Sequence, residues 1–208
     1  MAPQWDEMAA GYRRQLWLER AALRTLLDLL DVVTGDRLID VATGPAPLLS
    51  ELSRRERRPG AAVGVDTSAA MISLAPPLPS AWRLQVADAT DMPFDDGSFD
   101  VATASYLLHV LDRDTRRAVI AECARVLAPG GRLGTITIAP PRGPIATALT
   151  APIRAAAQRS QERLAGLRSL DPTAELEAAG FGVVVRRRSF RGYPSLCLVA
   201  RWPAGQRG

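Results

Sequence analysis

The 208-residue sequence has no lysine, one histidine and two cysteines. Cys123 and Cys197 are far apart, which excludes a disulfide framework or a cysteine-based metal site, since both need more sulfur at closer spacing. No run of about 18 apolar residues is free of charge, which excludes a conventional membrane span. The first residues contain acidic side chains and no apolar signal-peptide segment. We therefore expect a cytoplasmic protein.

Because lysine is absent, all 26 basic residues are arginine, and the net charge is +4. Arginine binds phosphates and carboxylates well, which raises a nucleic-acid hypothesis. Biased codon usage would produce the same composition, and we favour that explanation. The two basic clusters, RRERR at 54–58 and RRR at 186–188, are interpreted as solvated faces. Hydrophobic residues make up 47% of the chain, as expected for an ordinary globular protein with one core.

Strand-like runs alternate with helical patterns, which predicts an α/β fold with a mostly parallel sheet. Strands are predicted at 37–41, 61–65, 83–86, 99–104, 132–139, 181–189 and 196–202. Helices are predicted at 15–30, from Pro47 onward, and at 68–75, 115–127, 145–167 and 172–180. The PGG run at 129–131 is a stop signal between a helix and the fifth strand. A hairpin-length loop separates the last two strands, so we expect them to pair antiparallel.

Three acidic residues, Asp40, Asp66 and Asp88, lie at the ends of the first three predicted strands. Ligands of open α/β sheets bind beyond the carboxyl ends of the strands, so these acids would line one crevice. Gly44 would let the backbone approach a ligand closely. An Asp after the second strand can accept both hydroxyls of a ribose, and Asp88 could accept from the amine of adenine. The pattern predicts a nucleoside ligand, while the absence of G-x-G-x-x-G and G-K-[ST] argues against dinucleotide and P-loop sites.

Four ordered segments carry a family resemblance. LIDVATGPAP, from residue 38, is similar to the first motif of class I S-adenosylmethionine-dependent methyltransferases, and VGVDTSAAMISLA, from residue 63, resembles their second motif. The segments VADATDMPFDDGSFDVATASYLLHVLDR and ECARVLAPGGRL are similar to the ubiquinone/menaquinone-methyltransferase-like branch, methyltransferase type 11. The match spans about 38–139, with weaker similarity in WDEMAAGY and ELEAAGFGVVVRRR.

The resemblance implies a Rossmann-like doubly wound sheet of seven strands, mostly parallel, with an antiparallel C-terminal hairpin strand. It implies one domain, 1–208, in three parts. These are an N-terminal helical lid (1–30), a cofactor-binding core (31–140), and a short helical lid with the C-terminal strands (141–208).

The resemblance also implies that S-adenosylmethionine is the cofactor and assigns parts of it to residues of this chain. Asp40 and the backbone at 42–44 would hold the methionine portion with its ammonium group, and Asp66 would bind the ribose diol. Asp88 would accept from the adenine amine. The full set implied for cofactor binding is Tyr12, Asp40, Ala42, Thr43, Gly44, Asp66, Thr67, Met71, Asp88, Ala89 and Ser105.

The first motif departs from the family pattern, because Ala42 and Ala46 stand where glycines are usual. Alanine is tolerable there if φ is negative and costly if it is not. Pro45 would bias Gly44 toward an extended conformation. A distorted loop would weaken cofactor binding, which leaves open a non-catalytic cofactor-binding protein.

We predict methyl transfer to an oxygen, nitrogen or carbon of a small molecule by direct displacement, giving S-adenosylhomocysteine. The sulfonium already activates the methyl group, so the protein mainly aligns the reactants and excludes water. His109 is a candidate general base, with a packing histidine as the alternative, and Tyr106 is a second candidate. No metal is expected.

A nucleic-acid methyltransferase is the main alternative function, but the Asp/Asn-Pro-Pro-aromatic motif expected after the fourth strand is replaced by TASYLL. A nicotinamide-dependent reductase is disfavoured, because the sequence lacks the glycine pattern of such enzymes. Arginines at the rim of the pocket would favour an acidic substrate. The sequence indicates neither the substrate nor the oligomeric state.

Overall fold

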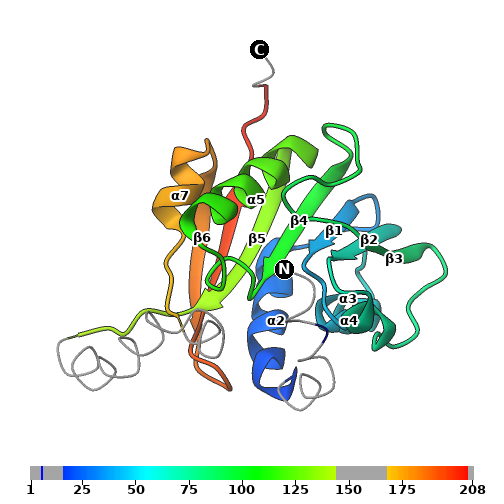
Figure 1. The fold of residues 1–208 in the computed structure, drawn as a ribbon, viewed down its shortest axis with the longest axis horizontal. Coiled ribbons are helices and arrows are strands. Elements are labelled where there is room, and N and C mark those ends of the chain that lie inside the picture. Colours follow the sequence, from blue (N-terminus) through cyan, green and yellow to red (C-terminus); the bar gives the residue numbers. More distant parts are fainter. Residues whose placement is uncertain (1–5, 7–15, 144–167, 206–208) are drawn as a thin grey trace.

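The computed structural model describes residues 6, 16–143 and 168–205. Strands and helices alternate through most of this part of the chain (Figure 1). In chain order the elements are α2 (Leu16–Leu30), β1 (Arg37–Val41), α3 (Pro47–Ser53), β2 (Ala61–Asp66), α4 (Ala69–Ser73), β3 (Trp82–Val86), β4 (Phe99–Ser105), α5 (Arg113–Val126), β5 (Leu127–Ile138), α7 (Thr173–Ala178), β6 (Gly182–Ser189) and β7 (Ser195–Arg201).

The strands form one seven-stranded sheet with the order β3-β2-β1-β4-β5-β7-β6. Pairs among β1 to β5 are parallel, whereas β7 pairs antiparallel with both β5 and β6. The predicted sheet and its antiparallel C-terminal strands are therefore confirmed. β1 pairs with β2 on one side and with β4 on the other. The strands up to β3 are therefore added on one side of β1, and the strands from β4 onward are added on its other side. Such a switch point is where open α/β sheets bind their ligands.

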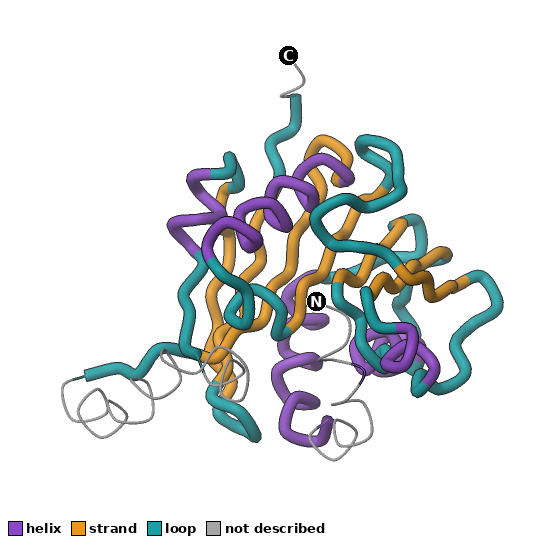
Figure 2. The backbone as a smooth tube through the Cα atoms, viewed as in Figure 1, coloured by secondary structure: helices purple, strands orange, loops and turns teal. Residues whose placement is uncertain are grey.

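Helices cover both faces of the sheet, as Figures 1 and 2 show. Alternate strand residues point to opposite faces, so Leu38 packs in a cluster with α2 and α3, and Ile39 packs in a second cluster with α5 and α7. Helix α2 buries Leu23, Leu26 and Leu30 in the first of these clusters. The C-terminal half of the predicted N-terminal lid is thus a helix of the core. The predicted helix 145–167 lies outside the described residues.

The predicted element boundaries differ from the structure mainly at β5. The PGG run, predicted as a stop before the strand, lies inside β5, which begins at Leu127. A Cβ on Gly131 would lie 2.8 Å from the Ala128 carbonyl oxygen, so glycine is needed there for a close backbone approach. Helix α5 begins at Arg113 rather than 115, because the Asp112 carboxylate accepts hydrogen bonds from the N–H groups of Asp114 and Thr115.

Candidate functional site

A cavity of about 410 Å³ lies at the carboxyl ends of the parallel strands. Its wall combines the loop after β1, the ends of β2 and β4, the segment after β3, and the start of α5. The structure brings together most of the predicted site residues in this wall, namely Ala42, Gly44, Asp66, Thr67, Met71, Asp88, Ala89, Ser105 and Tyr106. Of the three acids predicted to line one crevice, Asp66 and Asp88 lie in this wall, whereas the expectation for Asp40 is wrong because Asp40 is buried below the wall.

Asp40 is buried behind the cavity wall. Its carboxylate accepts hydrogen bonds of 2.7 Å from the hydroxyls of Thr43, in the same loop, and Thr103, on the neighbouring strand. Burial raises the pKa of Asp40 to about 6, and the two hydroxyls partly oppose the shift. Gly64 lies beside Asp40 in the register, and a Cβ there would come within 2.9 Å of the Thr43 side chain. Among the described residues, neither Asp40 nor Thr43 lines the cavity.

The loop after β1 has a left-handed residue at alternate positions. Ala42, Gly44 and Ala46 each have a φ of 55°. The predicted extended conformation of Gly44 is wrong, because the turn that leads from β1 into α3 requires a positive φ despite Pro45. Ala42 and Ala46 therefore both have the positive φ at which the sequence analysis expected alanine to be destabilising. A left-handed residue with a Cβ costs roughly 1–2 kcal/mol.

Asp66, at the end of β2, is held by backbone donors on both sides. One carboxylate oxygen accepts from the Gly44 N–H at 2.8 Å, and the other accepts from the Ser68 N–H at 2.9 Å. Burial is the largest influence on Asp66 and raises its pKa. A carboxylate oxygen has more than one acceptor site, so Asp66 can still accept from a diol in the cavity. Ser68, which caps α4 through Met71 N–H, also donates to the Asp6 carboxylate.

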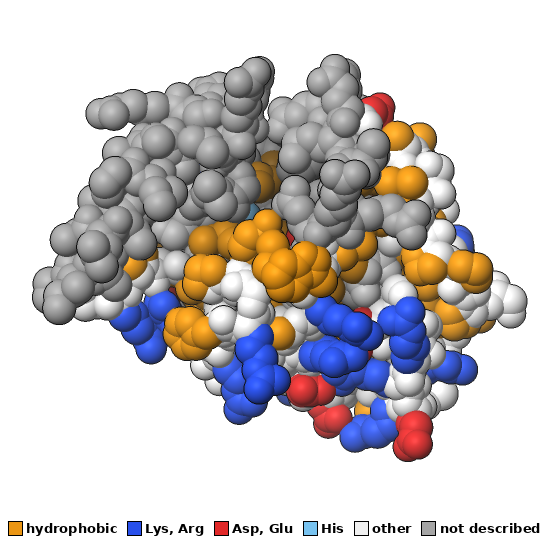
Figure 3. All heavy atoms as spheres, turned by 90° about the horizontal axis from the view of Figure 1, so that it is seen from below, with side chains coloured by type: hydrophobic (Ala, Val, Ile, Leu, Met, Phe, Trp, Pro, Cys, Tyr) orange, Lys and Arg blue, Asp and Glu red, His pale blue; other side chains and the backbone are white. Residues whose placement is uncertain are grey.

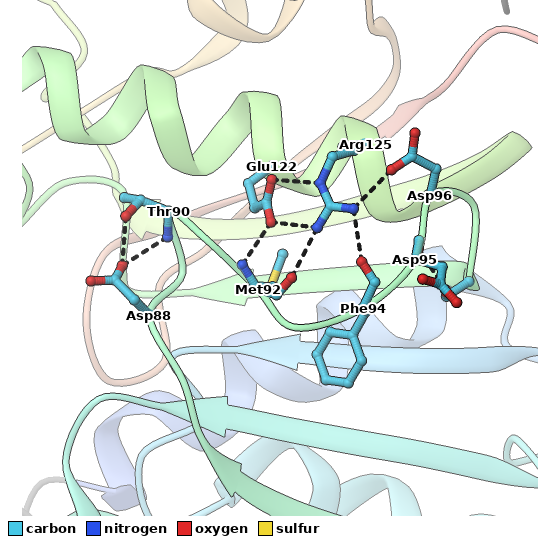
Figure 4. Close-up of polar contacts among 9 residues, drawn as sticks. Asp88, Thr90, Met92, Phe94, Asp95, Asp96, Glu122 and Arg125 are labelled. Atoms are coloured by element: carbon cyan, nitrogen blue, oxygen red, sulfur yellow. Dashed lines mark hydrogen bonds and ion pairs between the residues drawn. The ribbon is translucent and has the colours of Figure 1, made fainter.

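Asp88 lies in the segment after β3, where its carboxylate accepts from the Thr90 N–H at 2.8 Å and the Thr90 hydroxyl at 2.7 Å (Figure 4). These hydrogen bonds lower the pKa of Asp88, so it is a carboxylate at neutral pH. Ala89, between them, also lines the cavity.

Arg125 and Glu122, on α5, hold the chain that follows Asp88 (Figure 4). The Glu122 carboxylate accepts from the Met92 N–H at 2.6 Å, and Arg125 donates to the Met92 and Phe94 carbonyls at 2.9 and 2.7 Å. Arg125 also forms ion pairs with Glu122 at 2.6 Å and Asp96 at 2.8 Å. The last turn of α5 therefore sets the position of the segment that carries Asp88 into the cavity wall.

Ser105, the last residue of β4, and Tyr106, which follows it, both line the cavity. The Ser105 hydroxyl is buried and has no hydrogen-bond partner in the described part of the chain. Tyr106 has a φ of 57°, and its hydroxyl is 2.7 Å from that of Ser195. Burial raises the pKa of the Tyr106 phenol above its usual range, so it is protonated at neutral pH.

His109 does not line this cavity within the described residues but lines a second, adjoining one. Its ring lies edge-on to that of Tyr106, with the ring centres 6.1 Å apart. Tyr12 lies outside the described residues. Its predicted role and those of Tyr106 and His109 in catalysis remain predictions.

The wall also contains residues that the sequence analysis did not predict, namely Val65, Ala87, Thr90, Leu107, Val110, Leu111, Asp112, Thr115, Val119 and Arg168. The spacing of Asp112 and Thr115 is a helix-capping signal that could have placed the start of α5 here. Arg168 had no such signal, because it is far along the chain from the strand ends.

The residues that line the cavity fit S-adenosylmethionine. The Ser105 hydroxyl has no partner among the described residues and is available to a polar group of a ligand, and the space beside Gly44 is open, since a Cβ there would meet nothing within 4 Å. Asp66 and Asp88 supply acceptors, and Met71 and Ala89 supply apolar contact.

Within the described ranges, no group of three or more His, Cys, Asp or Glu is arranged to hold a metal ion. No helix of the described chain has the length and apolar character to cross a membrane.

Residues 38–131 match the family model described as "Methyltransferase domain". The demethylmenaquinone methyltransferase of Thermus thermophilus is 38% identical over 123 residues, which are 57% of this chain and 54% of that protein. The chain spans about half the length of the curated relatives it matches. Over this part the chain is similar to a methyltransferase domain. It is similar there to the demethylmenaquinone and ubiquinone/menaquinone biosynthesis methyltransferases as well.

Solved structures share the fold, and two of them serve as examples. A chain from the complex between the Trm112 methyltransferase activator of Haloferax volcanii and a methyltransferase superposes with a TM-score of 0.76, at 19% identity, over 98% of this chain and 96% of that one. The [4+2]-cyclase SpnF has a TM-score of 0.69, at 19% identity, over 89% and 81%. The second likeness shows that this fold also carries other chemistry, so the reaction has to be argued from the site.

Proposed function

We propose that this protein transfers a methyl group from S-adenosylmethionine to a nucleophilic atom of a small molecule by direct displacement. The observation that carries the proposal is the joint placement of Asp66, Asp88 and the open loop at Gly44 in one cavity wall at the switch point of the sheet. The cofactor, when bound, supplies a methyl group already activated by its sulfonium.

The residues of this chain would bind and orient the reactants. Asp66 would accept the ribose hydroxyls, and Asp88 and the Ala89 N–H would bind the adenine edge, with Met71 against its face. The carboxylate of Asp40 would attract the ammonium group through the loop after β1. Leu107, Val110 and Val119 supply apolar wall that would exclude water from the reacting atoms.

A calorimetric titration with S-adenosylhomocysteine tests the proposal. Asp66→Asn keeps the shape of the side chain but removes its charge and one pair of acceptor sites, so we expect binding to weaken about 30-fold. Asp95→Asn is the matched control, because Asp95 is exposed and is not among the cavity residues. Wild-type affinity in folded Asp66→Asn would overturn the assignment of the ribose site.

The nucleic-acid alternative receives no comparable support. Several exposed arginines are paired with acids, for example Arg24 with Glu51, Arg57 with Asp31 and Arg37 with Asp100. Figure 3 shows acidic side chains among the arginines on one face of the molecule. Such mixed charge is a weak attractor for a phosphate backbone.

A further inference from the structure

Tyr106, the first residue after β4, has a backbone conformation that residues other than glycine rarely adopt. Its φ is 57°, in the left-handed region, where a residue with a Cβ is strained. Strained residues persist only where the surrounding structure holds them, and they are concentrated at functional sites. Tyr106 lines the proposed cofactor cavity together with its neighbours Ser105 and Leu107. The path of the chain through this wall therefore depends on what holds Tyr106.

Tyr106 is held at its backbone and at its side chain. Its N–H donates to the Ile136 carbonyl oxygen at 2.7 Å, which fixes the backbone to β5. Its hydroxyl lies 2.7 Å from the hydroxyl of Ser195, the first residue of β7. Ser195 is fully buried and pairs with Ile138 of β5, so the sheet keeps its position fixed. Two strands of the sheet therefore hold Tyr106.

The direction of the hydrogen bond between Tyr106 and Ser195 follows from a third group. The Ser195 hydroxyl donates to the Tyr193 carbonyl oxygen at 2.9 Å, and this uses its one proton. Tyr106 must then be the donor to Ser195. Burial raises the pKa of the Tyr106 phenol, which keeps this proton in place at neutral pH. In this arrangement Tyr106 has no proton to give to a reactant, and its hydroxyl serves as a tether.

The tether controls the residues on either side of Tyr106. The Ser105 hydroxyl is buried in the cavity wall and has no hydrogen-bond partner in the described ranges. Ala104 lies beside Val41 in the register, so Ser105 lies next to the loop after β1. A change of φ at Tyr106 would move Ser105 and Leu107 relative to that loop.

We infer that Ser195 is a positioning residue of the proposed cofactor cavity. Through the Tyr106 hydroxyl it maintains the left-handed turn after β4, and this turn directs the Ser105 hydroxyl toward the ligand. Ser195 itself is not among the described wall residues. The inference rests on the proposed function, because its main consequence is for the affinity for S-adenosylhomocysteine.

A double-mutant cycle tests the inference. Ser195→Ala and Tyr106→Phe each remove the hydrogen bond, and calorimetry measures the affinity for S-adenosylhomocysteine at a temperature where every variant is folded. We expect each single variant and the double variant to bind about fivefold more weakly than wild type, because the two substitutions remove the same bond. Losses that multiply to about 25-fold in the double variant would overturn the inference, as would wild-type affinity in either single variant.

Thr137→Val is the matched control. Thr137 is a fully buried residue of β5 whose hydroxyl donates to the Leu170 carbonyl oxygen at 2.8 Å, and it is not among the described residues of either cavity wall. This variant should lower the free energy of unfolding as Ser195→Ala does, but it should leave the affinity unchanged. An equal loss of affinity in the control would show that the ligand responds to stability alone and would contradict a positioning role.

A second measurement needs no ligand. Hydrogen exchange of the Tyr106 N–H is compared with that of the β4 amides in the free protein. We expect the ratio to rise about fivefold in Ser195→Ala and Tyr106→Phe, because the turn opens more often, and to stay at the wild-type value in Thr137→Val. An unchanged ratio in the first two variants would show that the bond does not hold the turn and would overturn the inference.

The two proposals fail in different ways. If S-adenosylhomocysteine does not bind the wild-type protein, the proposed function fails, and the exchange ratio alone decides whether Ser195 holds the turn. If S-adenosylhomocysteine binds and its affinity is unchanged in Ser195→Ala, only the positioning role fails.

Discussion

The backbone N–H of Gly44 donates a 2.8 Å hydrogen bond to the carboxylate of Asp66. This bond joins the loop after β1 to the end of β2, so the two parts of the proposed cofactor site support each other before any ligand arrives. A change at either residue should therefore alter both the stability of the loop and the affinity for the cofactor.

Gly44→Ala tests that coupling. A Cβ at Gly44 would meet no atom within 4 Å, so the substitution adds only the strain of a left-handed residue, about 1 kcal/mol of lost stability. If the cofactor lies against this backbone, its affinity should fall by a larger factor than the strain explains. Chemical denaturation and calorimetry with S-adenosylhomocysteine measure the two effects. Unchanged affinity in the variant would place the cofactor elsewhere.

The two left-handed alanines offer a matched pair. Ala42→Gly should raise the free energy of unfolding by up to about 1 kcal/mol, because it relieves backbone strain at a half-buried position. Ala46 has the same φ but is fully buried in the core, so Ala46→Gly relieves the strain and loses a packed methyl group. We expect its net effect to be near zero. Equal gains in both variants would show that the methyl group of Ala46 contributes nothing.

The buried carboxylate of Asp40 predicts a pH dependence of stability. Its pKa is about 6 in the folded protein against an ordinary value of 3.8, so between these values the folded state holds a proton that the unfolded state releases. Stability from this group is therefore present at low pH and is lost as pH rises to about 6, by about 3 kcal/mol in all.

Asp40→Asn isolates this effect from those of other acids. The free energy of unfolding of the variant, relative to wild type, should increase from pH 4 to pH 7. The affinity of wild type for S-adenosylhomocysteine should rise through pH 6, since the ionised carboxylate attracts the ammonium group, and this rise should be absent in the variant. A parallel pH profile for the two proteins would contradict the prediction.

Arg125→Ala should reduce both stability and cofactor affinity. The variant leaves the Glu122 carboxylate without its ion pair and frees the Met92 and Phe94 carbonyls, so we expect a loss of about 2 kcal/mol. The segment that carries Asp88 would then be less well placed, and S-adenosylhomocysteine should bind more weakly at a temperature where the variant is still folded. Arg117→Ala, on the same helix, should change neither quantity.

The sequence predicted the sheet well because its strands follow short β-rich runs ended by turn residues. It did not predict the different depths of the three acids. Asp66 and Asp88 line the cavity, whereas Asp40 lies between Gly64 and Thr103 in the register, beneath Thr43. That depth depends on which strands are neighbours, and no single segment of sequence contains this information.

The sequence did not predict the second cavity either. Arg113 and Arg168 are separated by 55 positions (168 minus 113) and meet at one wall only through the tertiary fold. Arg168 lines the first cavity as well, and no segment of the sequence indicated which arginine would lie there.

The position of β7 has a consequence for the order of folding. This last described strand lies between β5 and β6, and β6 pairs with β7 alone. During synthesis β6 leaves the ribosome before the strand that joins it to the rest of the sheet. The edge of β5 is likewise unpaired until β7 emerges, so the nascent chain passes through a stage with an open apolar edge that is exposed to aggregation.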